Sequence, residues 1–263
     1  MLVHVRACGL CGSDLEKLGT DGVMGHEIEG VLDDGARVTV MHRVSCGECE
    51  RCRAGHESTC EEFRELRISP GGFAEKLEAT HVLALPDSIR EGDGIWVEPL
   101  ACVLRAADRV PRGRVLVAGC GAIGQLWVQV LVLRGDDVHV LEPRRDRLDA
   151  AAALGAAPLA GQVDAAVVTA PPALADALTA LAPGGTLLAF AASGDVQLDL
   201  DRVYRNELTL VGSRSATPAA FAAAIELLPS LQLPPVVRLP LAQFDEGVEL
   251  YRRGDALKVV FVP

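Results

Sequence analysis

The chain has 263 residues, of which 49% are apolar and only 4% aromatic. This length accommodates two lobes with sizeable cores, and a composition rich in Ala, Val and Leu favours α/β layers over an aromatic binding surface. The net charge of −11, from 25 basic and 36 acidic residues, argues against nonspecific binding to nucleic acid.

The first part of the chain, residues 1 to about 104, is rich in Gly, Cys and short apolar runs. Runs such as ARVTV at 36–40 and HVLAL at 81–85 suit short strands in an irregular, β-rich lobe. The N-terminus shows no pattern of a secretory signal, so we expect a cytoplasmic protein whose thiols stay reduced.

Four cysteines lie close together in the run CGECERCRAGHESTC, at Cys46, Cys49, Cys52 and Cys60. Their spacings of three, three and eight residues bring four thiolates around one tetrahedral ion. Zn²⁺ binds such a set with every position filled, and the alternative, a pair of disulfides, conflicts with a reducing compartment. The pattern therefore predicts a structural zinc site with no position for substrate.

From Arg114 onward, strand-like apolar runs alternate with helical patterns. Strands are expected at residues 115–120, 137–142, 164–170, 186–192 and 208–212. Helices are expected at 122–134, 144–156 and 172–182, and the chain finishes with a helix at 217–231, a strand at 236–241, a helix at 244–253 and a strand at 257–262. Such alternation predicts βαβ units and a doubly wound parallel sheet with helices on both faces.

One stretch, Val115 to Leu133, contains no charged residue and is nearly long enough to span a bilayer. Three glycines interrupt it, and its first part is better interpreted as a buried parallel strand followed by a buried helix. We expect no membrane partner.

A glycine-rich turn joins that strand to that helix. Gly119, Gly121 and Gly124 fit the pattern G-x-G-x-x-G, in which the first glycine allows a tight turn. The second lets the backbone approach a pyrophosphate, and the third permits close packing of helix on strand. We expect this turn, with Ala122 and Ile123 at the helix N-terminus, to bind a dinucleotide, although a lone fingerprint also occurs in ordinary turns.

The residue that ends the second strand, Glu142, lies 21 residues after Gly121. A carboxylate there accepts hydrogen bonds from the adenine ribose hydroxyls and repels a 2′-phosphate, which favours NAD over NADP. Arg144, Arg145 and Arg147 follow, and a guanidinium among them either pairs with such a phosphate or belongs to a solvated helix face. We expect NAD as the cofactor, with Arg147 among its contacts, and NADP as the less favoured alternative.

The cysteine lobe, the glycine turn and the N-terminal run ACGLCGSDLEKLGTDGVMGHEIEG together resemble the zinc-containing medium-chain dehydrogenase/reductase family, especially its polyol and secondary-alcohol dehydrogenase branch. GGFAE at 71–75, VEPLACVL at 97–104 and the tail ALKVVFVP extend this resemblance over nearly the whole chain. It implies a GroES-like, zinc-binding catalytic domain over residues 1–104, completed by 216–263, and a Rossmann dinucleotide-binding domain over 105–215.

The resemblance also implies a catalytic zinc with about three protein ligands and one open position. Cys11 and His26 lie in motifs whose family counterparts bind metal. For the third ligand we favour Glu98, with Glu27 close by as an outer or exchanging carboxylate. Ser13 stands where the family has the hydroxyl that takes the proton of the alcohol.

The reaction implied by the resemblance is oxidation of a polyol, an amino alcohol or a secondary alcohol. Zinc lowers the pKa of the alcohol, and a hydride passes from the zinc-bound alkoxide to NAD. A homodimer or homotetramer is the expected assembly. Two alternatives remain open: an NADPH-dependent reductase of the same fold, and a catalytically inactive module that binds zinc or nucleotide.

The chain begins almost at Cys11, whereas relatives carry further strands before that point. We therefore expect either a late start or a trimmed member with an open substrate pocket.

Overall fold

The computed structural model describes residues 1–191 and 195–263, which divide into two compact units. Unit 1 combines Met1–Cys102 with Ser215–Pro263, and unit 2 is Val103–Arg214. These bounds differ by one or two residues from the division expected from the sequence. The catalytic and dinucleotide-binding roles expected of the two parts stay predictions at this point.

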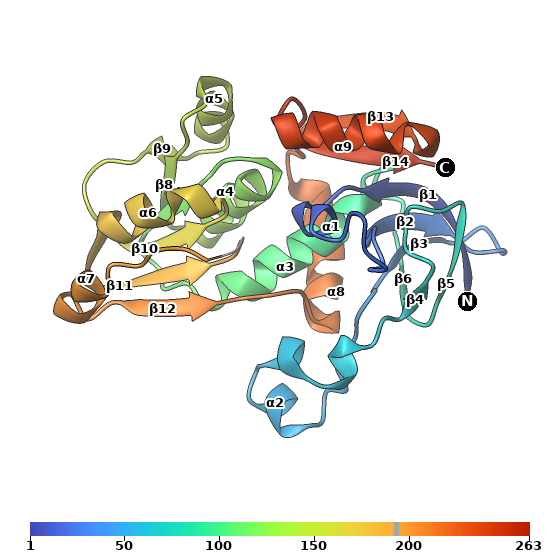
Figure 1. The fold of residues 1–263 in the computed structure, drawn as a ribbon, viewed down its shortest axis with the longest axis horizontal. Helices are drawn as coiled ribbons and strands as arrows, with labels where there is room; N and C mark the ends of the chain where they lie inside the picture. Colours follow the sequence, from blue (N-terminus) through green and yellow to red (C-terminus); the bar gives the residue numbers. More distant parts are fainter. Residues whose placement is uncertain (192–194) are drawn as a thin grey trace. The chain divides into compact units, whose positions relative to one another are not determined.

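Unit 1 is built on an eight-stranded, mainly antiparallel sheet (Figure 1). Its strands are β1 Leu2–Gly9, β2 Glu27–Val31, β3 Arg37–Val40, β4 Ile68–Ser69, β5 Lys76–Ala79, β6 Val82–Ala84, β13 Val236–Pro240 and β14 Lys258–Val262. Its helices are α1 Gly12–Leu15, α2 Glu50–Arg53, α8 Pro218–Leu227 and α9 Phe244–Arg253, and α3 Val97–Ala107 begins in this unit. Short 3-10 helices are η1 Glu57–Thr59, η2 Glu62–Arg64, η3 Gly94–Trp96, η5 Leu228–Ser230 and η6 Leu241–Gln243.

Strand β1 is the centre of this sheet because it pairs antiparallel with β2, β5 and β14. Near its end, Cys8 lies opposite Ile28 on one side and Phe261 on the other. The C-terminal strand is therefore an integral neighbour of the N-terminal strand, which explains why the two ends of the sequence form one unit.

Two apolar clusters hold unit 1 together. In the first, alternate residues of β1, Val3 and Val5, pack with Ile28 and Leu77 from neighbouring strands. In the second, Leu10, Val248, Val259 and Phe261 form the cluster that fastens α9 and β14 to the end of β1. Each fully buried side chain of this size contributes about 1.5–3 kcal/mol relative to exposure.

Unit 2 contains a six-stranded parallel sheet in the order β12-β11-β10-β7-β8-β9. The strands are β7 Arg114–Ala118, β8 Asp137–Leu141, β9 Ala157–Pro158, β10 Val163–Val168, β11 Leu181–Ala189 and β12 Thr209–Gly212. The helices are α4 Ala122–Arg134, α5 Arg145–Ala153, α6 Leu174–Ala180 and α7 Leu200–Arg205, with the 3-10 helix η4 Pro171–Ala173 before α6.

The central strands of this sheet are covered on both faces. Val115, Leu116, Val117 and Ala118 are all fully buried, and successive side chains of a strand point to opposite faces. The strand order reverses between β7 and β10, which is the position where doubly wound sheets bind ligands. The predicted Rossmann sheet and β-rich GroES-like partner are both confirmed.

The expected elements from residue 115 onward all exist, with bounds that differ by a few residues. The helix predicted at 122–134 is α4, and the strand predicted at 186–192 corresponds to β11, which ends at Ala189. Ala192 lies outside the described residues. Helix α7 occupies a stretch for which no element was predicted, because its six residues are too few to establish a period.

Among the described residues, no helix has both the length and the apolar character needed to cross a membrane. The apolar stretch from Val115 is instead strand β7, a turn and helix α4.

Candidate active site and metal centres

The turn after β1 presents the first candidate metal ligand. Cys11 is the N-cap of the short helix α1, and its backbone N–H donates to Asp14 Oδ2 at 3.1 Å. Asp14 N in turn donates to the Cys11 carbonyl at 3.0 Å. This reciprocal pairing satisfies the free groups of the helix start, so Asp14 fixes the backbone that carries the Cys11 thiol.

Asp14 also reaches the second candidate ligand. Its Oδ1 accepts a hydrogen bond from Gly25 N at 3.0 Å and lies 3.4 Å from His26 Nδ1. Gly25 has a φ of +78°, and a Cβ there would come within 2.8 Å of Phe73 N, so this turn requires glycine. Because Nδ1 faces Asp14, Nε2 is the atom of His26 that is free to bind a metal.

The ionised forms of Asp14 and His26 stabilise each other. Burial would lower the pKa of His26, but hydrogen bonds with Asp14 and Cys11 and the charges of Cys11 and Glu98 hold it well above its ordinary value. Burial would raise the pKa of Asp14, but the bond to His26 and the N–H groups of Gly25 and Cys11 lower it. Asp14 therefore stays ionised and favours cations at this position.

The third candidate, Glu27, opens β2 directly opposite Gly9 of β1. A side chain at position 9 would overlap the Glu27 carboxylate, so Gly9 provides the space for it. Glu27 Oε2 is in ion-pair contact with Lys258 Nζ, and this oxygen has no aligned hydrogen bond. Both residues are almost fully buried.

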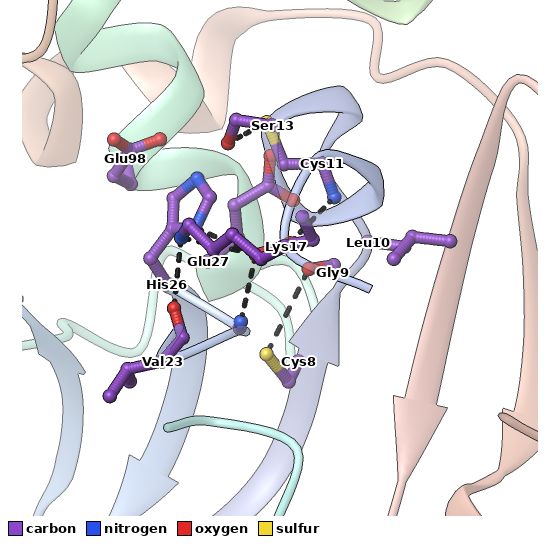
Figure 2. A network of polar contacts seen from close by, with 12 residues as sticks. Cys8, Gly9, Leu10, Cys11, Ser13, Lys17, Val23, His26, Glu27 and Glu98 are labelled. Carbon is purple, nitrogen blue, oxygen red and sulfur yellow. Dashed lines mark hydrogen bonds and ion pairs between the residues drawn. The ribbon is translucent and has the colours of Figure 1, made fainter. Parts of the chain in front are cut away.

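Ligand atoms of Cys11, His26 and Glu27 all lie within 4.8 Å of one another. A half-buried thiol, a buried imidazole and a buried carboxylate at this separation form a donor set that suits Zn²⁺. Figure 2 shows the three side chains converging at the start of α1. The residues present therefore fit a catalytic zinc ion.

Glu98 enters the same region from the first turn of α3 (Figure 2). It is not one of the three groups within 4.8 Å; instead, its Oε1 accepts a hydrogen bond from the Cys102 thiol at 3.3 Å. Burial raises the pKa of Glu98, and the charge of His26 partly offsets this effect. The choice between Glu98 and Glu27 as third ligand remains a prediction.

Two further side chains border this cluster. The Ser13 hydroxyl is exposed and donates to Cys11 Sγ at 3.4 Å, so it lies beside the candidate metal position. The His42 ring lies against that of His26, with ring centroids 4.9 Å apart.

The second cluster is formed by the four cysteines of the loop around α2. Their sulfur atoms approach one another at 3.4 Å for Cys49 and Cys52, 3.6 Å for Cys60 and Cys46, and 3.8 Å for Cys46 and Cys52. All eight cysteines lie in the described part of the chain and carry free thiols. Hydrogen bonds from backbone groups, foremost that of Cys46, lower the pKa of Cys60 to about 6, which favours the thiolate that binds metal.

In unit 2 the glycine turn follows β7 at the switch point of the sheet. Gly119 has a φ of +99°, and a Cβ on Gly124 would overlap the Gly119 carbonyl, so these two glycines are required by the turn. A Cβ on Gly121 would meet only Arg147 Nη1, at 3.9 Å. The backbone at Gly121 is therefore open to a phosphate, and Ala122 and Ile123 begin α4 beside it.

Glu142 follows β8 and faces this turn. Its Oε2 accepts from Cys120 N at 2.8 Å, and its Oε1 accepts from Arg144 N at 3.0 Å. The Arg144 guanidinium pairs with Asp146, and that of Arg145 with Asp149. Of the three arginines, Arg147 is the one whose guanidinium lies near Gly121, so the residues present fit a dinucleotide with a pyrophosphate at the turn.

Two functional candidates were missed from the sequence, Asp14 and Lys258. A signal existed for each. Asp14 stands three residues after Cys11, the N3 position of a capping box. Lys258 is a lone cation at the start of the apolar strand KVVFV, and a buried charge requires a partner.

Comparisons with known proteins agree with this architecture. A family model described as "Alcohol dehydrogenase GroES-like domain" matches residues 1–87. L-galactonate-5-dehydrogenase of Escherichia coli (strain K12) is 27% identical over 263 residues, covering 84% of this chain and 77% of that protein. Sorbitol dehydrogenase of Bacillus subtilis (strain 168) is 28% identical over 264 residues, covering 81% and 74%.

A solved structure described as a zinc-binding dehydrogenase from Sinorhizobium meliloti 1021, bound to NADP, superposes with a TM-score of 0.83. It is 26% identical and covers 100% of this chain and 92% of that chain. The fold, the two thiol-containing clusters and these matches define a zinc-binding oxidoreductase of two units. These matches confirm the resemblance to the zinc-containing medium-chain dehydrogenase/reductase family and the enzyme class expected from the sequence.

We predict that Asp14→Asn weakens metal binding at the Cys11–His26–Glu27 cluster by about 10- to 100-fold, the usual effect of losing an outer partner of a ligating histidine. The amide also places donors against the N–H groups of Cys11 and Gly25. Competition with a chelator measures the affinity. Glu16→Gln, the same change at an exposed position of the same turn, is the control; equal affinities in the two variants would contradict the role given to Asp14.

We predict that Cys49→Ser lowers both the melting temperature and the zinc content, from two ions per chain to about one, because losing one thiolate opens a closed tetrahedral site. Elemental analysis and thermal unfolding check this. Cys8→Ala, which removes a buried thiol outside both clusters, is expected to retain both ions. Unchanged zinc content in Cys49→Ser would reject the structural zinc site.

Proposed function

We propose that this chain is a zinc- and NAD-dependent dehydrogenase that oxidises a polyol, an amino alcohol or a secondary alcohol. The observation that carries the proposal is the buried convergence of Cys11, His26 and Glu27 within 4.8 Å. Sorbitol and L-galactonate are the substrates named for two relatives, and both molecules are polyhydroxylated. This supports a substrate with several hydroxyl groups.

Each residue of the cluster has a separate role in the proposed reaction. Cys11 and His26 would hold the metal, and a carboxylate from Glu27 or Glu98 would complete the protein ligands of a catalytic site. When bound, zinc supplies Lewis acidity, which lowers the pKa of an alcohol in contact with it. Ser13, exposed beside Cys11, is placed to receive the proton that the alcohol loses.

The nicotinamide cofactor belongs to unit 2. The open backbone at Gly121 and the start of α4 take the pyrophosphate, with Arg147 beside it. Glu142, already oriented by two backbone N–H groups, accepts the ribose hydroxyls through its remaining lone pairs. These contacts would hold the dinucleotide, which when bound would supply the hydride acceptor.

A second candidate is a reductase of the same fold that uses NADPH. The position of Arg147 near Gly121 favours it, because a guanidinium there could pair with a 2′-phosphate. The similar structure bound to NADP agrees with that alternative. The Glu142 carboxylate disfavours it by repulsion, and we place NAD first. For the assembly we propose a homodimer or homotetramer.

We predict that His26→Ala reduces the oxidation of any substrate found by at least about 1,000-fold, because several kcal/mol of charge stabilisation disappear with the metal. NADH binding is expected to persist, since the glycine turn belongs to the other unit. Fluorescence titration of NADH beside a rate assay over a panel of alcohols separates the two effects.

The control for this experiment is His81→Ala, which removes an imidazole of the same unit that contacts the Thr80 hydroxyl. It is expected to keep its activity. Retained turnover in metal-free His26→Ala would refute the zinc mechanism and favour a zinc-independent reductase.

We predict that Glu142→Ser raises the KM for NAD⁺ by about 10- to 100-fold, because hydrogen bonds to a charged group are lost. Use of NADP⁺ should improve, since the 2′-phosphate no longer faces a carboxylate and Arg147 is close. Steady-state kinetics with both cofactors measure this. Asp137→Ser, at the opposite end of β8, serves as the control; a wild-type preference for NADP⁺ would show the assignment of Glu142 to be wrong.

A further inference from the structure

One buried cation in unit 1 has no part in the proposed reaction. Lys258, the first residue of β14, is 3% exposed. Its ammonium group is in ion-pair contact with Glu27 Oε2 and donates to the Leu10 carbonyl at 3.2 Å. It also lies over the ring of Trp96, 5.4 Å from the centroid.

These three contacts reach the segments that carry the candidate metal ligands. Leu10 directly precedes Cys11, Glu27 directly follows His26, and Trp96 stands two residues before Glu98. Three stretches that are far apart in the sequence therefore meet one ammonium group. A lysine that only filled space in the core would need no such set of partners, because an aliphatic residue packs there without a desolvation cost.

The surroundings of this ammonium carry an excess of acidic groups. Asp14, Glu27 and Glu98 are 0%, 1% and 7% exposed, and the Cys11 thiol lies among them. Asp14 is matched by His26 and Lys17, and in the described part of the chain Glu98 has a hydrogen bond from the neutral Cys102 thiol alone. Glu27 depends on Lys258 for its compensating charge.

We propose that Lys258 is a positioning residue of the metal cluster: its fixed positive charge holds the Glu27 carboxylate and the Leu10 carbonyl in place before a metal binds. The ligand set is thus assembled in the metal-free protein. The same ammonium competes with an incoming divalent cation for Glu27, and this competition outweighs the gain from orienting the carboxylate in advance, so Lys258 weakens metal binding while it organises the site.

This inference deepens the proposed function and rests on it for the presence of a metal at the Cys11–His26 cluster. It is tested by metal affinity, which does not require that the substrate be known. Cobalt reports the two clusters separately, because thiolate-to-cobalt absorption differs between one thiolate and four.

The experiment compares wild-type protein with Lys258→Met and Lys258→Arg, all substituted with Co²⁺ and titrated with a chelator. In Lys258→Met, Glu27 has no cation until the metal arrives, so the one-thiolate site should hold cobalt about tenfold or more tightly. Lys258→Arg keeps the charge and should behave like the wild type. The four-thiolate site should be unchanged in every variant.

The matched control is Arg37→Met. Arg37 pairs with Glu29, a carboxylate 1% exposed and two residues beyond Glu27 on the same strand, at 2.9 Å. Removing it also leaves a buried carboxylate without its cation, but the Arg37 side chain bonds only Glu29 and the carbonyls of Ile89 and Arg90 in the described part of the chain, none of which is a candidate ligand or adjacent to one. We expect a loss of thermal stability with no change in cobalt affinity.

If Lys258→Met fails to fold, it is combined with Glu27→Gln, which removes the uncompensated carboxylate. The double variant should fold, and its one-thiolate site should bind cobalt no more tightly than that of Glu27→Gln alone. An unchanged or weaker one-thiolate site in Lys258→Met would overturn the inference, as would a double variant that still fails to fold. Wild-type protein without cobalt at that site would overturn the proposed function as well.

Discussion

Buried charge has to be compensated, and this requirement organises the β-rich unit around the end of β1. Ionised groups removed from water are tolerated only when each finds an opposite charge or several hydrogen bonds. Asp14 meets the requirement with His26 and two backbone N–H groups, and Glu27 meets it with Lys258. The side chains that could hold a metal are thus already oriented by the partners that make their burial possible.

The compensation of buried charge links segments that are far apart in the sequence. Lys258 and Leu10 are separated by 248 positions in the sequence, yet the ammonium of one binds the carbonyl of the other. The site is therefore complete only when β14 has paired with β1, and Leu10 N donating to the Val259 carbonyl fastens the same junction. Bringing such distant segments together costs loop-closure entropy, which the pairing of β14 with β1 has to offset.

In unit 2 the glycine turn, and not a set of buried charges, shapes the candidate site. A dinucleotide needs close approach to backbone, and here the absence of side chains provides it: Gly119 supplies the turn, Gly124 the packing, and Gly121 the open surface. Glu142 holds the turn by accepting a hydrogen bond from Cys120 N. In the proposed function the same carboxylate also accepts the ribose hydroxyls, and it would then bear on the choice between NAD and NADP.

The sequence by itself determined the two-part architecture, the four-thiol cluster and the glycine turn. Each of these depends on short spacing: Cys46 to Cys60, or Gly119 to Gly124, lie within one local segment whose pattern has few structural solutions. Helix α4 was predicted with its observed bounds because glycine and charge mark both of its ends.

Only the tertiary structure decided the roles of Asp14 and Lys258 and which of Glu27 and Glu98 joins Cys11 and His26 in one cluster. Glu27 falls within 4.8 Å of both, whereas Glu98 accepts a hydrogen bond from Cys102. Nothing local distinguishes these carboxylates, since the distance between side chains from different strands and helices is set by the register of β1, β2 and β14 and by the packing of α3. A lysine in an apolar strand, likewise, becomes a counter-ion only when the sheet brings a carboxylate to it.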